Sequence, residues 1–121
     1  MKTIINNGHK FSEFTLGTVQ LGLNYGINNS HGMPTEEESA DILKTALSCG
    51  VISFDTARAY GESEAVLGRF FGKSNVEKTI ITKVRFDDTR KEDIKESLLM
   101  QINDSMKKLA LSKIPFIMLH N

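Results

Sequence analysis

The chain has 121 residues, of which 40% are apolar, so it is long enough to form one small domain with its own core. Its 15 lysines and arginines balance 15 aspartates and glutamates, and neither sign gathers into a long block. A nucleic-acid-binding surface is therefore not expected. The single cysteine, Cys49, excludes an intrachain disulfide and a cysteine-based zinc site built from this chain alone.

The N-terminal residues 1–7 become polar too early for a signal peptide. No later apolar run approaches the roughly 20 residues of a membrane span. We therefore expect a cytoplasmic protein without a membrane partner.

The first expected element is a small hairpin, with Ile4 and Ile5 in one strand, a turn at Asn7 and Gly8, and residues 11–14 in the other strand. A strand of a larger sheet is expected next, at residues 14–19. A polar loop rich in turn-forming residues then covers residues 24–34.

Thr35 is expected to start a helix, because Thr35 and Glu38 have the Thr-x-x-Glu spacing of a capping box. The helix places Ala40, Leu43, Ala46 and Leu47 on one face. Gly50 stands where a C-terminal cap is expected, and residues 51–54 form the next strand.

A short helix over residues 63–71 is expected to bury Val66, Leu67 and Phe70. Ser63 is interpreted as its N-cap, because no histidine is near it in sequence to activate it as a nucleophile. Residues 79–82 are rich in β-branched side chains and predict a third strand.

A second Thr-x-x-Glu spacing at Thr89 predicts the start of the last helix. The helix has an apolar stripe along one face, formed by Ile94, Leu98, Ile102 and Leu109. A fourth strand follows at residues 116–119.

Apolar strands separated by helices predict right-handed parallel βαβ units. A doubly wound sheet would carry a glycine-rich phosphate loop after its first strand. Gly17 and Gly22 are five residues apart and match neither G-x-G-x-x-G nor G-x-x-x-x-G-K-[ST], which favours a barrel. A complete TIM (β/α)8 barrel needs about 250 residues. The predicted fold is therefore α/β, a partial TIM barrel of four parallel strands and three helices after a short hairpin.

Ionisable residues stand where three of these strands end. Asp55, Lys83 and His120 each follow an apolar strand, and Tyr60 lies in the loop after Asp55. Each has a simpler interpretation: Asp55 could cap a turn, Lys83 could reach solvent, and His120 could be a polar strand end. Because the carboxyl ends of parallel neighbours share one side of the sheet, we expect the four side chains to converge.

Such a group of side chains suits the reduction of a carbonyl. A phenol is a weak acid at neutral pH, but a nearby ammonium stabilises its anion. Lys83 could do this for Tyr60, while Asp55 holds the ammonium in place. His120 could orient the substrate oxygen, and a nicotinamide would deliver hydride.

A longer motif surrounds Asp55 and Tyr60. Residues 54–64, Phe-Asp-Thr-Ala-Arg-Ala-Tyr-Gly-Glu-Ser-Glu, are followed by Leu67-Gly68. This run resembles the aldo/keto reductase signature, in which D-[ST]-A, Y-G, S-E and L-G recur in this order. Residues 16–18, Leu-Gly-Thr, look like the family segment that lies against the nicotinamide. Residues 81–83 and 119–121 look like the family's lysine and histidine strands.

The resemblance implies roles for particular residues. Asp55, Tyr60, Lys83 and His120 match the catalytic tetrad, with Tyr60 as the general acid that is tuned by Lys83 and Asp55. Gly17, Thr18 and Asp55 match positions that contact the cofactor, NADPH (NADP), and no metal is implied.

Our leading hypothesis is an NADPH-dependent reductase of aldehydes or ketones, present as the N-terminal half of an aldo/keto reductase domain. Residues 1–121 reach only the fourth barrel strand, whereas the family binds most of the dinucleotide with later strands. We expect this part alone to lack turnover and to self-associate through its open sheet edges.

Two alternatives remain open at this point. The chain could be a catalytically silent half-barrel or an assembly module. It could also be a lyase or isomerase that uses Lys83 as a Schiff-base amine. The motif over residues 55–68 argues against the second of these.

Overall fold

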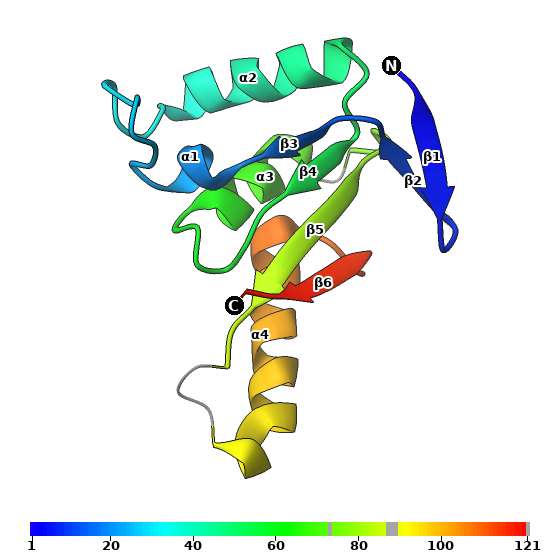
Figure 1. The fold of residues 1–121 in the computed structure, drawn as a ribbon, viewed down its shortest axis with the longest axis vertical. Helices are drawn as coiled ribbons and strands as arrows, with labels where there is room; N and C mark the ends of the chain where they lie inside the picture. Colours follow the sequence, from blue (N-terminus) through cyan, green and yellow to red (C-terminus); the bar gives the residue numbers. More distant parts are fainter. Residues whose placement is uncertain (73, 87–89, 121) are drawn as a thin grey trace.

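The computed structural model describes residues 1–72, 74–86 and 90–120. An antiparallel hairpin of β1 (Thr3–Asn6) and β2 (His9–Ser12) precedes a parallel sheet in the order β3-β4-β5-β6 (Figure 1). The sheet strands are β3 (Thr15–Gly17), β4 (Ser53–Asp55), β5 (Thr79–Val84) and β6 (Phe116–Leu119). The strands are therefore neighbours in chain order, as a barrel requires.

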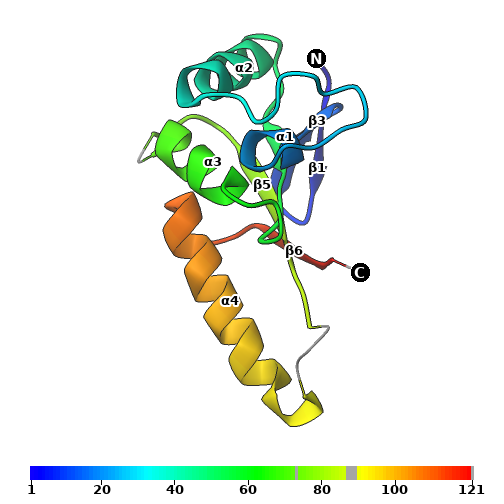
Figure 2. The same ribbon diagram turned by 90° about the vertical axis from the view of Figure 1, so that its left-hand side faces the viewer.

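The three long helices connect consecutive strands of the sheet. The helices are α1 (Val19–Gly22), α2 (Glu36–Ser48), α3 (Ser63–Phe71) and α4 (Ile94–Leu109), with a 3-10 turn η1 (Lys91–Asp93) before α4. Figure 2 shows α2, α3 and α4 on the same side of the strands. The predicted fold class, part of a TIM barrel after a hairpin, is confirmed. Among the described residues, no helix is both long and apolar enough to cross a membrane.

The sequence signals at both ends of α2 are confirmed. The Glu38 backbone N–H donates to Thr35 Oγ1 at 3.2 Å, and the Thr35 N–H donates to Glu38 Oε2 at 2.8 Å. These two bonds are the reciprocal pair of a capping box. Gly50 follows the helix with a φ of +86°, a left-handed conformation that favours glycine.

The core lies between the sheet and its helices. Phe54 of β4 is fully buried and meets Phe71 edge to face, with ring centroids 5.2 Å apart. Phe71 is therefore the buried phenylalanine of α3, and the expected burial of Phe70 is only partial. On α4, Leu109 alone of the predicted stripe is buried, and Gln101 and Ser105 occupy the buried face instead.

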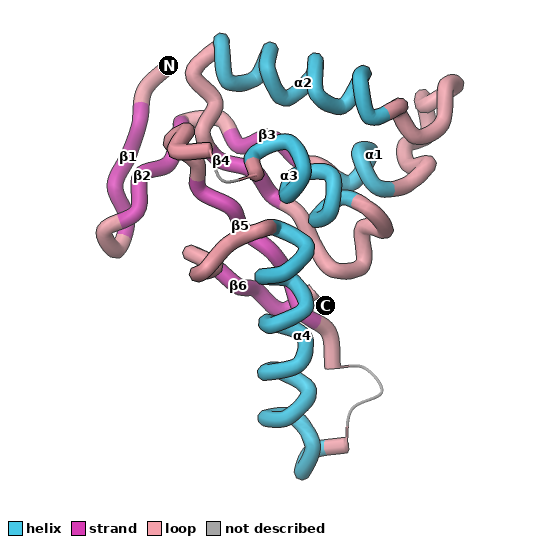
Figure 3. Tube along the Cα trace, turned by 180° about the vertical axis from the view of Figure 1, so that it is seen from behind, coloured by secondary structure: helices cyan, strands magenta, loops and turns pink. Residues whose placement is uncertain are grey.

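The predicted hairpin is present, and it closes the amino ends of the strands. Asn7 and Gly8 form its turn with positive φ angles, and its second strand is His9–Ser12 rather than residues 11–14. Phe11 packs on Phe116 of β6 with ring centroids 5.0 Å apart. Figure 3 shows the hairpin beside the same ends of the sheet strands from behind.

Three strands of the parallel sheet have bounds that differ from the sequence predictions. The strand expected at residues 14–19 ends at Gly17, because Thr18 leaves the extended conformation (φ −118°, ψ 12°) and α1 begins at Val19. The strand expected at residues 51–54 is Ser53–Asp55, and the one expected at residues 79–82 continues to Val84. The predicted helix start at Thr89 lies outside the described residues.

Within the described part of the chain, β3 and β6 are the edges of the parallel sheet. The outer strand β6 exposes three large apolar side chains, Ile117, Met118 and Leu119. Unpaired strand edges can template pairing with another chain. Self-association through these edges stays a prediction.

Candidate active site at the carboxyl ends of the strands

The strands deliver the predicted side chains to one end of the sheet. Asp55 is the last residue of β4, and His120 directly follows β6. Lys83 lies inside β5 and faces Met118 in the register of β5 with β6. All these strands run parallel, so their carboxyl ends form a common rim.

The Lys83 ammonium is the centre of the rim. It donates to both carboxylate oxygens of Asp55 at 2.7 Å and to the Thr56 carbonyl at 3.0 Å. It also lies 3.4 Å from the phenolic oxygen of Tyr60. The Lys83 side chain is 13% exposed and that of Asp55 is 31% exposed, so the ion pair is only partly screened by water. The simpler interpretation of Lys83 as a solvent-directed lysine is therefore wrong.

Tyr60 and His120 complete the group. Their rings meet edge to face at a centroid distance of 5.3 Å and an angle of 89°. The Lys83 ammonium also stands over the Tyr60 ring, 5.0 Å from its centroid. Among the described residues, buried His120 Nδ1 has no hydrogen-bond partner. The expected convergence of the four side chains is confirmed, and their catalytic roles stay a prediction.

A buried hydroxyl network lies beneath this rim. The Ser63 hydroxyl donates to the Thr18 carbonyl at 2.9 Å and lies 2.9 Å from the Thr56 hydroxyl. The Thr18 hydroxyl donates to the Asp55 carbonyl at 2.8 Å. The interpretation of Ser63 as an N-cap is wrong, because Glu62 occupies that position and Ser63 is the first helical residue. Its short polar side chain instead links β3 and β4 to the start of α3.

A buried carboxylate supports the strand that carries Lys83. Glu64 in the first turn of α3 is 1% exposed, and its Oε1 accepts a 2.6 Å hydrogen bond from the Thr82 hydroxyl. Thr82 immediately precedes Lys83 in β5. Side chains of neighbouring strand residues point to opposite faces of a sheet. Glu64 therefore supports β5 from the face opposite the Lys83 side chain.

The candidate cofactor residues differ in their accessibility. A Cβ built on Gly17 meets no heavy atom within 4 Å, and Gly17 is paired in register with Asp55, so there is open space beside this part of the rim. Thr18 is fully buried, and its backbone N–H donates to the Asp55 carbonyl at 2.9 Å. Thr18 therefore has no exposed surface for a direct ligand contact, and its hydrogen bonds help to hold Asp55 in place.

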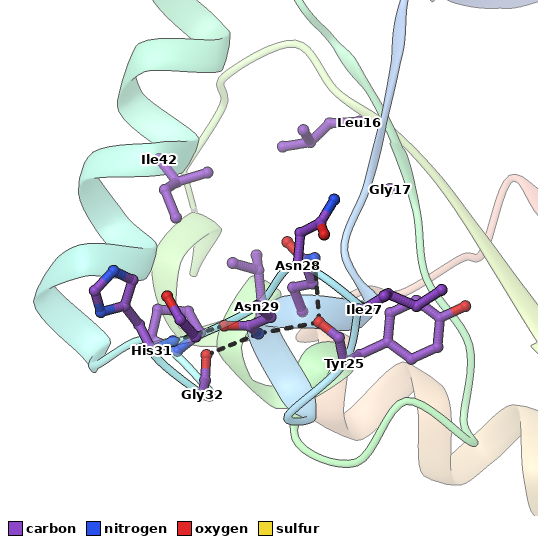
Figure 4. A pocket seen from close by; sticks show the side chains of 14 residues that line it. Leu16, Gly17, Tyr25, Ile27, Asn28, Asn29, His31, Gly32 and Ile42 are labelled. Atoms are coloured by element: carbon purple, nitrogen blue, oxygen red, sulfur yellow. Dashed lines mark hydrogen bonds between the residues drawn. The ribbon is translucent and has the colours of Figure 1, made fainter.

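A hollow lined in part by Gly17 lies beside the rim. It has a volume of about 1020 Å³ between β3, α2 and the loop over residues 24–34, and Figure 4 shows Leu16 and Ile42 across from Asn29 and His31. Gly17 lines it, but none of the four rim side chains does. We expect the chemistry at the rim, because Lys83 lies within hydrogen-bonding distance of both Asp55 and Tyr60 there, an arrangement suited to moving a proton.

Gly22, at the end of α1, sets the backbone position of Tyr60. A Cβ on Gly22 would lie 1.8 Å from the Tyr60 carbonyl oxygen and 2.3 Å from the Ser63 nitrogen. The Gly22 carbonyl accepts a hydrogen bond from the Glu62 N–H at 3.2 Å. Only glycine allows this approach. The sequence offered the glycine but not its partner, because 38 residues separate Gly22 from Tyr60.

Comparisons with known proteins bear on this arrangement. The sequence model of the aldo/keto reductase family matches residues 13–121. A structure described as an aldo-keto reductase from Pseudomonas aeruginosa is 29% identical, with a TM-score of 0.79, and the match covers 94% of this chain and 44% of that one. A structure described as a 2,5-diketo-D-gluconic acid reductase B is 25% identical, with a TM-score of 0.66 and coverages of 94% and 35%.

A third structure adds to the fold comparison. The aldo-keto reductase from Klebsiella pneumoniae in complex with NADPH is 18% identical, with a TM-score of 0.70 and coverages of 92% and 36%. The chain therefore spans less than half the length of these three solved structures.

Proposed function

The chain belongs to the aldo/keto reductase family, and from this premise we propose that it supplies the proton-transfer half of a carbonyl reduction. The proposed reaction converts an aldehyde or ketone to an alcohol with a nicotinamide cofactor, NADPH. The proposed catalytic residues are Asp55, Tyr60, Lys83 and His120.

The observation that carries this proposal is the placement of the Lys83 ammonium. It lies 3.4 Å from the Tyr60 hydroxyl and is held by both Asp55 carboxylate oxygens at 2.7 Å. When Tyr60 gives its proton to a carbonyl oxygen, the phenolate that remains faces a fixed positive charge. A charge positioned in advance stabilises the product of this proton transfer without reorganisation.

His120 has a separate proposed role. Its ring stands edge to face against Tyr60, at the same rim, so a carbonyl oxygen that accepts the Tyr60 proton lies near the imidazole. A hydrogen bond from His120 would orient that oxygen. A bound nicotinamide would supply the hydride that the carbonyl carbon receives.

Gly17 and Asp55 suit the nicotinamide end of such a cofactor. The open space beside Gly17 adjoins Asp55, and a flat ring could lie there without meeting a side chain from Gly17 itself. The comparison with a relative that binds NADPH supports a nicotinamide cofactor. We propose that Gly17 and Asp55 contact it, and that Thr18 acts through Asp55.

The test replaces Tyr60 with phenylalanine in a complete barrel that contains these residues. Tyr60→Phe removes the proton donor, so the rate of aldehyde reduction should fall by at least about 100-fold, with little change in NADPH affinity. The matched control is Tyr25→Phe, at the other tyrosine of the chain, which is 56% exposed and lines the hollow beside the rim. Retained turnover in Tyr60→Phe would overturn the assignment, and NADPH consumption with small aldehydes measures it.

A further inference from the structure

One turn of α4 contacts both segments that carry reacting groups. Residues 56–62 join β4 to α3 and carry Tyr60, and we call them the Tyr60 loop. The Arg58 side chain of this loop donates from Nη1 to the Asp104 carboxylate at 2.7 Å and to the Gln101 carbonyl at 3.0 Å. Arg58 stands two residues before Tyr60, and its own N–H donates to the Lys83 carbonyl at 3.3 Å. The loop is therefore fastened to α4 on one side and to β5 on the other.

The Gln101 side chain attaches α4 to the segment that follows β5. Its Oε1 accepts from the Arg85 N–H at 3.1 Å, and its Nε2 donates to the Arg85 carbonyl at 2.9 Å. Arg85 is the second residue after Lys83, where β4 has already ended. The Gln101 amide thus occupies the place of a neighbouring strand and pairs with both backbone groups of Arg85.

We propose that Gln101 and Asp104 are positioning residues that set the separation of Tyr60 and Lys83. Gln101 and Asp104 are three residues apart on α4, so they lie on the same face of the helix. One holds the end of β5 and the other holds the Tyr60 loop, so a shift of α4 moves both segments. The catalytic part of this inference rests on the proposed function, whereas the geometric part does not.

The hydrogen bonds of Gln101 explain why a polar residue is buried at this position of α4. Gln101 is buried, and both ends of its amide are hydrogen-bonded, with Nε2 also donating to Ser97 Oγ at 3.0 Å. A buried amide whose groups are all paired fixes one arrangement of its neighbours, since any other leaves a polar group unsatisfied. An apolar residue would fill the same space without fixing the Arg85 backbone.

The chain is well suited to a spectroscopic test, because it contains two tyrosines and no tryptophan. In a Tyr25→Phe background, near-ultraviolet circular dichroism of the tyrosine band reports only the surroundings of Tyr60. Asp104→Ala should change this band, because Arg58 loses its carboxylate partner. Asp104→Asn keeps an oxygen that faces Arg58 and should restore most of the parent signal.

The matched control is Glu36→Ala, which removes a carboxylate from the Arg69–Glu36 ion pair between α3 and α2. That pair has an N–O distance of 2.6 Å and joins the two helices rather than the loop to α4. Glu36→Ala should leave the Tyr60 band unchanged. Gln101→Met is the second variant, because it keeps the side-chain length and removes both bonds to Arg85; it should change the band in the same direction as Asp104→Ala.

Kinetics in a complete barrel separate positioning from general stabilisation. Asp104→Ala should lower kcat about 10-fold with KM for the carbonyl substrate nearly unchanged, because a small misplacement of the acid affects the transition state most. An unchanged Tyr60 band in both Asp104→Ala and Gln101→Met would overturn the positioning role, whatever happens to stability. A changed band in the 121-residue chain, together with a complete barrel that reduces no carbonyl, would instead leave the positioning intact and refute the proposed function.

Discussion

At the amino ends of the strands the hairpin pairs its polar groups with the sheet, whereas at the carboxyl ends three ionisable side chains and a phenol share one small volume. The Ser12 hydroxyl accepts from the N–H groups of Ile52 and Ser53, and Thr79 Oγ1 donates to the Lys10 carbonyl at 2.7 Å. At the other end, buried His120 Nδ1 has no partner among the described residues.

The two ends of the strands therefore differ in what their polar side chains do: those at the amino ends stabilise the fold, and those at the carboxyl ends are available for chemistry. Groups that are fully hydrogen-bonded to one another have no reason to bind a ligand, and their loss costs folding free energy. Groups held close together with unused hydrogen-bonding capacity can bind and protonate a substrate. Substitutions at the two ends should therefore act on different measured quantities.

The largest expected effect is on catalysis at the rim. Lys83→Met should lower carbonyl reduction in a complete barrel by about 100-fold, because the phenolate of Tyr60 then forms without a facing ammonium. The matched control is Lys10→Met at the hairpin, where Lys10 also pairs with a carboxylate, Glu77, at 3.0 Å. Lys10→Met should keep the parent rate. Equal rates for both variants would contradict the division of roles between the two ends.

The rim residues were predictable from sequence because each stands at a fixed place in a strand. Asp55, Lys83 and His120 follow apolar runs, and parallel neighbours bring such positions together whatever the details of packing. The capping box at Thr35 was predictable for a similar reason, since all its bonds join residues three apart.

What the sequence did not reveal depends on partners far apart in the chain. Ser63 looked like a helix cap, but its hydroxyl bonds to Thr18, 45 residues earlier. The helix α1 has only four residues, too few for an apolar period to show. On α4, the apolar stripe predicted the wrong buried face and left out Gln101. Gln101, Ser105 and Leu109 follow a spacing of four, which could have indicated the buried face.

At the hairpin end the expected effect is on stability alone. Ser12→Ala should lower the free energy of unfolding by about 1–3 kcal/mol, because two backbone N–H groups and the Phe14 carbonyl lose a buried partner. Ser48→Ala is the matched control, since that exposed hydroxyl donates to the Thr45 carbonyl one turn earlier in the same helix. Urea denaturation of the three proteins measures the difference. A rate of carbonyl reduction that falls with Ser12→Ala, at a temperature where the variant stays folded, would contradict the separation of the two ends.

The smallest expected effect links pH to the attachment of α4 at the rim. A hydrogen bond from Arg58, followed by one from Lys108, lowers the pKa of Asp104 from its ordinary value. Because the pKa in the folded state lies below that in the unfolded state, the carboxylate stabilises the fold above the unfolded-state pKa. This contribution is lost as the pH falls toward the folded-state pKa.

The Asp104 side chain is 42% exposed, so water screens the pair and the contribution should be less than about 1 kcal/mol. Urea denaturation at about pH 6 and about pH 3, which bracket the ordinary aspartate pKa, measures it. Asp104→Asn should lose less stability than the parent between these two pH values, because an amide does not titrate there. If the Tyr60 circular dichroism band of the Tyr25→Phe protein also shifts over this acid range and stays constant in Asp104→Asn, the same carboxylate acts on both stability and rim geometry. An acid-induced loss of stability that is identical in the two proteins would show that the ionisation of Asp104 contributes nothing to the pH dependence of stability.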